Sequence, residues 1–283
     1  MKLVRFGNHG LEKPGIVDHA GGIRDLSGVV KDIAGDVLLP ASLARIGQIR
    51  LEDLPRVQSG LRVGPCVGSV GKIVCVGLNY RAHANESGMS VPTEPVLFMK
   101  ATSAISGPFD AVKIPRNSVK TDWEVELGVV IGRPGVHIAA NRAFEHVAGY
   151  CVANDVSERA FQLERGGQWV KGKSCDTFAP IGPWLVTADE VPDPQALELF
   201  LEVDGCRYQA SSTRAMIFGV AELIAYISGF MSLQSGDIIF TGTPSGVGLG
   251  QKPPRYLMPD QSLRLGVSGL GEQAYKTVSA DAP

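Results

Sequence analysis

Acidic residues beside two apolar segments are the first feature of this sequence that could perform chemistry. The segment TDWEVELGVVIG, residues 121–132, alternates as a strand does, so Glu124 and Glu126 should project from the same face. Asp155 ends a second apolar run, GYCVAND, where an uncompensated carboxylate would be costly. Three carboxylates from two strands suit a hard divalent cation such as Mg²⁺ or Mn²⁺, which would offset their mutual repulsion. We expect Asp122 to be a turn or edge residue at the mouth of the strand.

The sequence HANE supplies a candidate general base. His83 and Glu86 are three residues apart, so one helical turn would bring their side chains together. A carboxylate orients a neighbouring imidazole and raises its basicity, which suits proton abstraction from water. A surface pair on an exposed helix explains the same spacing equally well.

Two further segments could contribute to such a site. Lys173 lies close in sequence to the paired glycines of RGGQW and could stabilise a developing oxyanion, although a solvated surface charge is the simpler interpretation. The loop TGTPSGVG, residues 241–248, lacks the Gly-Lys-Ser/Thr of a phosphate-binding loop. Its amides and hydroxyls could hold a substrate carboxylate, or the segment could be a plain turn.

Composition excludes several classes of protein. The 283 residues carry a formal net charge of −2 without a long run of either sign, which argues against a nucleic-acid-binding or membrane-surface protein. We find neither a signal peptide nor an apolar segment of the roughly 20 residues needed to span a membrane. The five cysteines are widely spaced without a CxxC pair, so we expect reduced thiols and a cytoplasmic location.

The pattern of segments predicts an α+β, β-rich fold in two units. Residues 1–70 predict a small β-containing domain, and residues 57–72 have the composition of a linker. Residues 71–283 form the larger unit, in which short strands lack the regular alternation with helices that a doubly wound sheet requires. One convincing helix is expected before Gly236, because Val220, Leu223, Ile224, Ile227 and Met231 recur at helical spacing.

Six motifs follow one another along the chain: CVGLNYRAHANE, PVLFMK, DWEVELGVVIG, ANDVSERAFQ, KGKSCDTFAPIGPW and GDIIFTGTPSGVG. They occur in the order found in the fumarylacetoacetate hydrolase family, which the chain resembles over roughly residues 70–270. The resemblance implies a mixed β-sheet roll, a homodimer, and Mg²⁺ or Mn²⁺ as the cofactor. The small N-terminal unit resembles an extra domain that many bacterial members carry.

The resemblance also implies roles for individual residues. The metal ligands fall on Glu124, Glu126 and Asp155; the catalytic residues on His83, Glu86 and Lys173; and the substrate contacts on Gln162, Thr243 and Lys100. Some members have an arginine where this chain has Leu78, so a contact made by that arginine should be lost here.

The implied chemistry is hydrolysis of a carbon–carbon bond in a 2,4-diketo acid of the acylpyruvate type, which gives pyruvate and a carboxylic acid. The segment from residue 155 to residue 194 is similar to a bacterial subgroup that acts on 2,4-diketo-3-deoxy-rhamnonate or fuconate. The polar residues Gln162, Glu164 and Arg165 would suit such a hydroxylated tail.

Two alternatives remain open at this point. A decarboxylase of the oxaloacetate type would use the same metal site and the same enolate, but no attacking water. A non-catalytic binding protein could retain the fold alone, although the retained acids, histidine pair and lysine argue against it.

Overall fold

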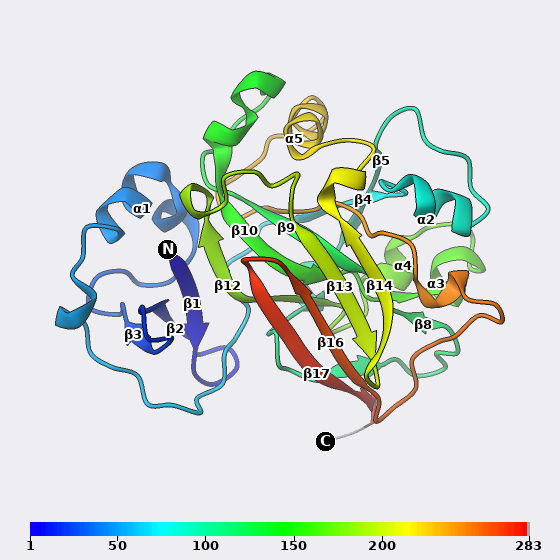
Figure 1. Cartoon of the computed structure of the whole chain (residues 1–283), viewed down its shortest axis with the longest axis horizontal. Helices are drawn as coiled ribbons and strands as arrows, with labels where there is room; N and C mark the ends of the chain where they lie inside the picture. The colour runs from blue at the N-terminus through cyan, green and yellow to red at the C-terminus, as the bar shows by residue number, and fades with distance from the viewer. Residues whose placement is uncertain (282–283) are drawn as a thin grey trace.

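The computed structural model describes residues 1–281, and two β-sheets dominate it (Figure 1). The larger sheet has ten strands in the order β3-β2-β1-β12-β10-β9-β15-β4-β5, with β6 paired to β12. These strands are β1 (Lys2–Phe6), β2 (Lys13–Val17), β3 (Ile23–Asp25), β4 (Ile73–Gly77), β5 (Val96–Lys100), β6 (Ile105–Ser106), β9 (Val125–Ile131), β10 (Val147–Asn154), β12 (Ala179–Thr187) and β15 (Ile238–Phe240). The expected β-rich α+β fold is therefore confirmed.

The second sheet has five strands in the order β14-β13-β16-β17-β7 and packs against the centre of the first. Its strands are β7 (Val112–Ile114), β13 (Glu198–Val203), β14 (Cys206–Ser212), β16 (Ser262–Val267) and β17 (Gly271–Ser279). The expected hairpin at Asp204 and Gly205 joins β13 to β14. A separate two-stranded ladder pairs β8 (Thr121–Asp122) with β11 (Ser157–Glu158).

The helices are short and lie around the sheets. The α-helices are α1 (Pro40–Ile46), α2 (Arg81–Glu86), α3 (Arg159–Leu163), α4 (Val170–Lys173) and α5 (Val220–Ser228). The 3₁₀ turns are η1 (Gly35–Leu38), η2 (Leu51–Asp53), η3 (Thr102–Ala104), η4 (Ala140–His146), η5 (Ala188–Glu190), η6 (Thr213–Ala215) and η7 (Gly248–Gly250).

Strands β9 and β10 form the centre of the molecule. Every residue of both strands is buried, and β13, β16 and β17 of the five-stranded sheet pack against them (Figure 1). A strand buried on both faces reads as a nearly continuous apolar run, and this is the pattern of residues 125–131 apart from Glu126. Glu126 is therefore an ionisable side chain within an otherwise apolar, buried strand.

Helix α5 is shorter than the sequence predicted. It ends at Ser228, where the backbone N–H of Gly229 caps it by donating to Tyr226 and Ile227, so Met231 lies outside the helix. The apolar spacing continued past the true end because Met231 packs against the same core from an irregular segment.

The N-terminal unit continues the large sheet, since β1 pairs antiparallel with β12. Residues 57–72 are not a solvated linker, because Cys66 and Val67 are buried in the common core. Arg62 of this segment ties the units together: its guanidinium donates to Asp110 at 2.6–2.7 Å and to Glu12 at 2.8 Å. The division near residue 70 stays a prediction.

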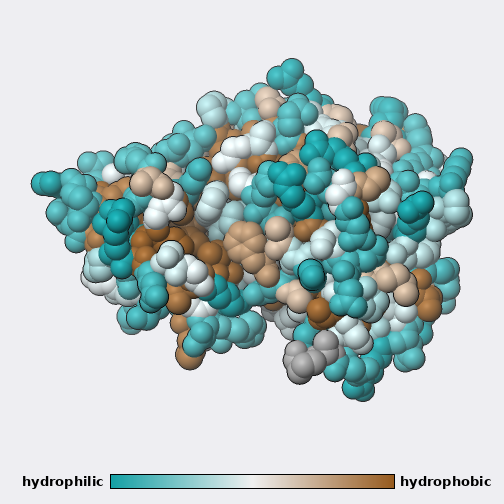
Figure 2. Space-filling model, turned by 60° about the horizontal axis from the view of Figure 1, so that its bottom comes forward, coloured by the Kyte–Doolittle hydropathy of each residue, from teal (hydrophilic) through white to brown (hydrophobic). Residues whose placement is uncertain are grey.

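On the face in Figure 2, hydrophobic residues gather over the N-terminal unit, while much of the remaining surface is polar. Within residues 1–281, we find no helix that combines the length and apolar character needed to cross a membrane. The homodimer expected from the resemblance stays a prediction.

Candidate active site

The pairing of β9 with β10 brings the three carboxylates together. Glu126 lies opposite Ala153 in the ladder, and the backbone N–H of Asp155 donates to the Glu124 carbonyl at 2.9 Å. The Asn154 side chain continues the pairing by accepting from the Glu124 N–H at 2.9 Å. One oxygen from each of Glu124, Glu126 and Asp155 lies within 4.8 Å of the others, and all three side chains are buried.

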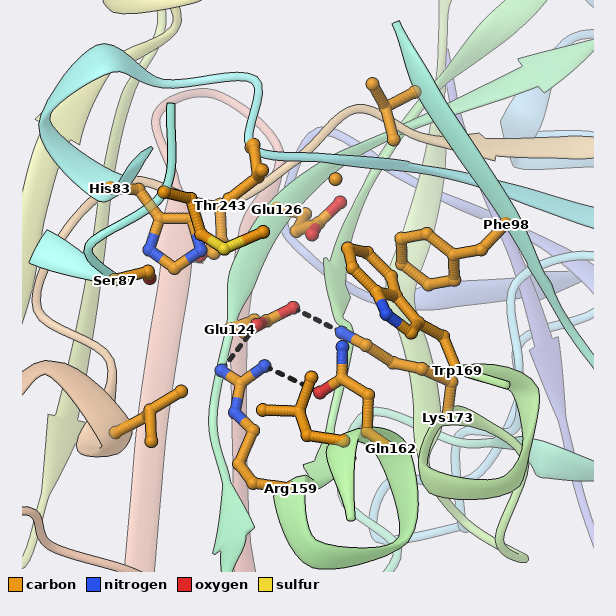
Figure 3. Close-up of a pocket in the computed structure, with 16 residues that line it drawn as sticks. His83, Ser87, Phe98, Glu124, Glu126, Arg159, Gln162, Trp169, Lys173 and Thr243 are labelled. Carbon is orange, nitrogen blue, oxygen red and sulfur yellow. Dashed lines mark hydrogen bonds and ion pairs between the residues drawn. The ribbon is translucent and has the colours of Figure 1, made fainter. Parts of the chain in front are cut away.

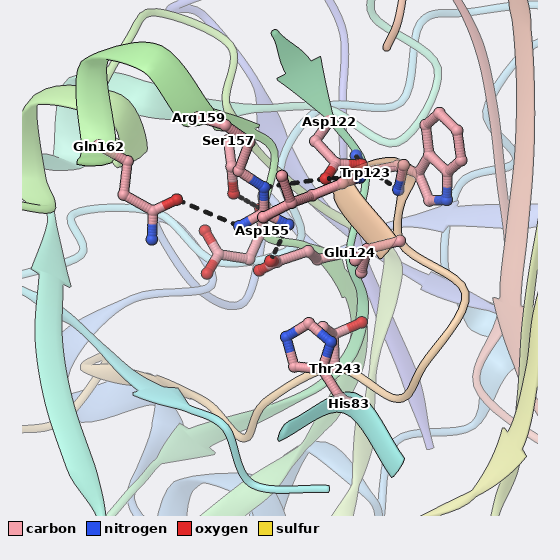
Figure 4. Close-up of polar contacts among 12 residues, drawn as sticks. His83, Asp122, Trp123, Glu124, Asp155, Ser157, Arg159, Gln162 and Thr243 are labelled. Carbon is pink, nitrogen blue, oxygen red and sulfur yellow. Dashed lines mark hydrogen bonds and ion pairs between the residues drawn. The ribbon is translucent and has the colours of Figure 1, made fainter. Parts of the chain in front are cut away.

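Three buried cations surround this cluster. Lys173 Nζ donates to Glu124 Oε2 and to Asp155 Oδ2, both at 2.7 Å. Lys100 Nζ donates to Asp155 Oδ1 at 2.5 Å, and Arg159 Nη2 donates to Glu124 Oε1 at 2.6 Å (Figures 3 and 4). Every oxygen of Glu124 and Asp155 therefore already accepts one charge-assisted hydrogen bond.

Glu126 accepts no hydrogen bond from Lys100, Arg159 or Lys173 in the described structure. Its one hydrogen bond in the described part of the chain comes from the backbone N–H of Gly242, at 2.7 Å to Oε2. Burial, followed by the neighbouring Asp155 and Glu124, raises the pKa of Glu126 well above its usual value. Burial also acts to raise the pKa of Glu124, but Arg159 and Lys173 outweigh it and hold that pKa well below the ordinary range.

Gly242 can approach Glu126 because it has no side chain. Its φ of +99° is unfavourable for other residues, and a Cβ there would lie 2.7 Å from the Asn79 Cβ. Asn79 is fully buried and fixes this region by donating to the carbonyls of Phe218 and Thr241 and by accepting from the Phe218 N–H.

His83 and Glu86 both lie on α2, as the sequence predicted, but they are not in hydrogen-bond contact. Nδ1 of His83 is 3.5 Å from Glu86 Oε2, and this buried nitrogen lacks a hydrogen-bond partner in the described structure. Glu86 is itself held by the Gly246 N–H, 3.0 Å from each carboxylate oxygen. A shift of a few tenths of an ångström would form the His–Glu hydrogen bond.

The predicted substrate contacts have different surroundings. Gln162 lines the pocket beside the cluster, and its Oε1 accepts from Arg159 Nη1 at 3.1 Å. Thr243 also lines the pocket, but its hydroxyl donates to the Val125 carbonyl at 2.9 Å and accepts from Gln209 at 2.7 Å. The Thr243 hydroxyl can donate a hydrogen bond to a substrate carboxylate only if its hydrogen bond to the Val125 carbonyl breaks.

Lys100 lies behind the cluster rather than beside the pocket. Its ammonium group is buried, and it donates to Asp155 and to the Val156 carbonyl at 3.0 Å. Lys100 is not among the residues that line the pocket. The geometry therefore favours a role in orienting Asp155 over the direct substrate contact that the sequence suggested.

Two charged residues at the site were missed by sequence reasoning. Asp122 is fully buried rather than at an edge, because it accepts from the N–H groups of Gly248 and Leu249 and from Arg159 Nε. Arg159 bridges Asp122 and Glu124, as Figure 4 shows. The available signal was the spacing of Arg159 and Gln162, which lie three residues apart just after Asp155.

The residues present fit a divalent cation. Four buried carboxyl groups, those of Asp122, Glu124, Glu126 and Asp155, lie beside only three cations, Lys100, Arg159 and Lys173, so one carboxyl group has no cationic partner. The uncompensated carboxylate is Glu126, and the donor set consists entirely of oxygen atoms, which Mg²⁺ and Mn²⁺ prefer.

The cluster forms one end of a partly open pocket with a cavity volume of about 90 Å³, room for a small group only. Figure 3 draws Glu124 between His83 and Lys173, with Phe98 and Trp169 beyond the lysine. A small acid could therefore bind with its polar groups against the cluster and the remainder against the aromatic side chains.

Replacing Glu126 with glutamine should separate metal binding from folding. Glu126→Gln should lose Mn²⁺ affinity by more than the roughly 10–100-fold seen when groups behind a ligand are changed, as measured by titration calorimetry. Because Glu126 has no cationic partner to lose and glutamine can still accept from the Gly242 N–H, the metal-free variant should melt at or above the wild-type temperature. The exposed change Glu145→Gln is the control, and retained Mn²⁺ affinity in Glu126→Gln would refute the site.

Replacing Arg159 with methionine should destabilise the protein strongly. Arg159→Met leaves the carboxylates of Asp122 and Glu124 buried without their shared partner, so we expect a loss of about 3–5 kcal/mol in urea unfolding. The matched variant Arg142→Met breaks only an exposed pair with Glu145 and should change nothing measurable. Equal stability of the two variants would contradict this reading of Arg159.

Comparison with known proteins gives a consistent assignment. The family model for the fumarylacetoacetate (FAA) hydrolase C-terminal domain matches residues 72–278. A Burkholderia multivorans protein, named only as a candidate hydrolase, is 62% identical over 281 residues, which cover 99% of this chain and all of that protein.

Two solved structures extend this likeness to the fold. A candidate HpcE protein of Mycobacterium smegmatis has a TM-score of 0.89 at 41% identity, over 99% of this chain and 100% of that one. The maleylpyruvate hydrolase of Sphingobium sp. SYK-6, in complex with manganese and pyruvate, has a TM-score of 0.81 at 29% identity, over 99% of both chains. The chain therefore belongs to the fumarylacetoacetate hydrolase family.

Proposed function

We propose that this protein is a divalent-metal-dependent hydrolase that cleaves a carbon–carbon bond in an acylpyruvate-type 2,4-diketo acid, giving pyruvate and a carboxylic acid. The observation that carries the proposal is a buried cluster of three carboxylates at one end of a pocket that also holds His83. A related hydrolase binds manganese and pyruvate, which are respectively a cofactor of the expected class and the expected product.

Glu124, Glu126 and Asp155 would hold Mg²⁺ or Mn²⁺. When bound, the cation supplies a Lewis acid for the carboxylate and 2-oxo group of the substrate. Gln162 and the loop at Thr243 lie beside this end of the pocket and would orient those same groups.

His83 would activate the water. Its Nδ1 faces Glu86, so Nδ1–H would donate to that carboxylate and leave Nε2 as the base. Nε2 takes one proton from water, and the resulting hydroxide attacks the carbonyl carbon at position 4 of the substrate. Glu86 then stabilises the imidazolium that forms.

Lys173 would stabilise the tetrahedral oxyanion produced by this attack. An ammonium group has three N–H donors, and the carboxylates of Glu124 and Asp155 use two of them. Burial acts to lower the pKa of Lys173, but Asp155 and Glu124 raise it above its usual value, so the ammonium form is kept. The bond between carbons 3 and 4 then breaks, which releases the carboxylic acid and leaves the electron pair on carbon 3 as the pyruvate enolate. The proton held on His83 Nε2 would then be transferred to carbon 3, which completes pyruvate and restores the base.

The surroundings of His83 and Glu126 bear on the two alternatives, a decarboxylase and a non-catalytic binding protein. A decarboxylase needs no water-activating base, whereas His83 is buried at the pocket with Glu86 beside its ring, which favours hydrolysis. A non-catalytic protein would have no need to retain a buried carboxylate without a partner. The sugar-acid subgroup stays a prediction, and of the three polar residues behind it only Gln162 lines the pocket.

Replacing His83 with alanine tests the proposed base. With Mn²⁺ present, His83→Ala should lower kcat for pyruvate release from acetylpyruvate by about 100- to 10,000-fold, because general-base catalysis is lost. Mn²⁺ affinity should be retained, since His83 is not among the grouped carboxylate ligands.

The exposed histidine His137 provides the control variant, His137→Ala, which should behave as the wild type. Unchanged kcat in His83→Ala would contradict the assigned base. Faster pyruvate release by the wild type from oxaloacetate than from acetylpyruvate, with carbon dioxide, would make the protein a decarboxylase.

A further inference from the structure

The pocket has two chemically different ends. The polar end is lined by Glu124 and Glu126 of the acidic cluster and by His83, Arg159, Gln162, Lys173 and Thr243. The rest of the lining is mostly apolar and consists of Val76, Gly77, Leu78, Ser87, Met89, Phe98, Leu163, Trp169 and Leu249. A substrate whose 2-oxo acid group meets the cluster must extend its other end along this apolar wall.

Specific packing contacts hold the two aromatic side chains of the wall in place. The rings of Phe98 and Trp169 meet edge to face with centroids 5.3 Å apart. Gly77, at the end of β4, makes room for the indole, because a Cβ at that position would lie 2.8 Å from Trp169 Cζ3. Lys173 Nζ lies 4.9 Å from the centre of the Phe98 ring, so the wall begins directly beside the proposed oxyanion donor (Figure 3).

Another part of the wall, at Leu78, has a strained backbone. Leu78 has a φ of +57°, a conformation that costs a residue with a Cβ about 1–2 kcal/mol. The hydrogen bonds of the next residue, Asn79, hold the turn in place. Met89 and Leu163 complete the mouth and are 48% and 47% exposed, so both offer apolar surface that a bound group could cover.

Glu164 and Arg165, two polar residues expected to recognise a hydroxylated substrate tail, interact with other side chains instead. Glu164 pairs with Lys120 at the surface, and the Arg165 guanidinium lies 4.6 Å from the centre of the Phe161 ring. Neither residue lines the pocket. The basic side chains that do line it, His83, Arg159 and Lys173, are all at the cluster end, so a second carboxylate at the far end would find no cation among the lining residues.

We propose that Leu78, Phe98 and Trp169 form an acyl subsite that selects substrates with an apolar group, alkyl or aryl, beyond the bond that is cleaved. This inference rests on the proposed acylpyruvate chemistry and names its substrate class. It runs against the hydroxylated sugar acid expected from the sequence. Apart from the Ser87 hydroxyl and the Trp169 indole N–H, the lining here is apolar, so a hydroxyl group that met neither of them would lose water without gaining a hydrogen-bond partner.

The test compares acylpyruvates that differ only in the acyl substituent, using the full-length protein with Mn²⁺. The substituents are methyl, propyl, phenyl and 1,2-dihydroxypropyl. We expect kcat/KM for pyruvate release to rise by about fourfold for each buried methylene, so propyl should exceed methyl by about tenfold or more. The dihydroxypropyl substrate should fall at least tenfold below propyl. Equal or faster release from the dihydroxypropyl substrate would overturn the inference.

Variants of Trp169 show whether this wall sets the preference. In Trp169→Ala the ratio of kcat/KM between propyl and methyl should fall toward one, and Trp169→Phe should restore most of it. Phe230→Ala changes an exposed aromatic residue on another face and should keep the wild-type ratio. A Trp169→Ala variant that loses activity equally on both substrates would show a structural role only and contradict the subsite.

A binding measurement separates this inference from the proposed reaction. The 2-oxo acids 2-oxohexanoate and pyruvate lack the carbonyl that would be attacked, and their affinities can be compared by calorimetry with Mn²⁺ present. Tighter binding of 2-oxohexanoate that disappears in Trp169→Ala would support the subsite even if no acylpyruvate were hydrolysed. Equal affinities for the two acids, whatever the outcome of the hydrolysis assay, would contradict it.

Discussion

The ion-pair network around Glu124 is the constraint on which the rest of this site depends. Glu124 receives Arg159 on one oxygen and Lys173 on the other, and each of these cations reaches a second buried acid, Asp122 or Asp155. Removing four carboxylates and three cations from water is expensive, and their mutual attraction offsets the expense only when the geometry is good. The central strands, the 159–173 segment and the glycine loop must therefore all be placed accurately relative to one another.

The fold supplies this accuracy from rigid elements. Strand β9 is buried on both faces, and the five-stranded sheet supports it directly, because Gln209 of β14 accepts from the Val125 N–H at 3.0 Å. The same glutamine donates to Thr243 and to the Pro244 carbonyl, so one side chain connects the acidic strand, the second sheet and the glycine loop. A site placed on strands in this way is held more precisely than a site on loops alone.

Stability poorly explains a network that leaves the buried carboxyl group of Glu126 without a cationic partner. Well-packed apolar residues of similar volume would fill the same space at least as favourably. An incoming cation, by contrast, would find Glu126 beside two carboxylates already oriented by lysines. Lys173 would then have two roles. It orients Glu124 and Asp155 by donating a hydrogen bond to each, and its third N–H stays available for the substrate.

Local pattern was sufficient to predict much of this arrangement. Alternation predicted that Glu124 and Glu126 share a face, and the apolar run before Asp155 indicated that this acid needs compensation. The burial of Asp122 and the bridging position of Arg159 were not predictable in the same way, because both follow from contacts between residues 35 to 127 positions apart in sequence. Helix α5 was predicted too long because apolar spacing does not distinguish a helix from an irregular segment that packs into the same core. The nature of the acyl end of the pocket depends on how Leu78, Phe98 and Trp169 meet in space, which their sequence positions do not reveal.

The most direct test of the central claim is anomalous X-ray diffraction from crystals of the protein soaked with Mn²⁺. The account predicts one strong anomalous peak bounded by oxygens of Glu124, Glu126 and Asp155, at the roughly 2.0–2.2 Å expected for carboxylate ligands of such cations. Lys173 should remain beside the same carboxylates. A cluster without an anomalous peak at saturating Mn²⁺, or a peak held by other residues, would contradict the assignment of this cluster as the metal site.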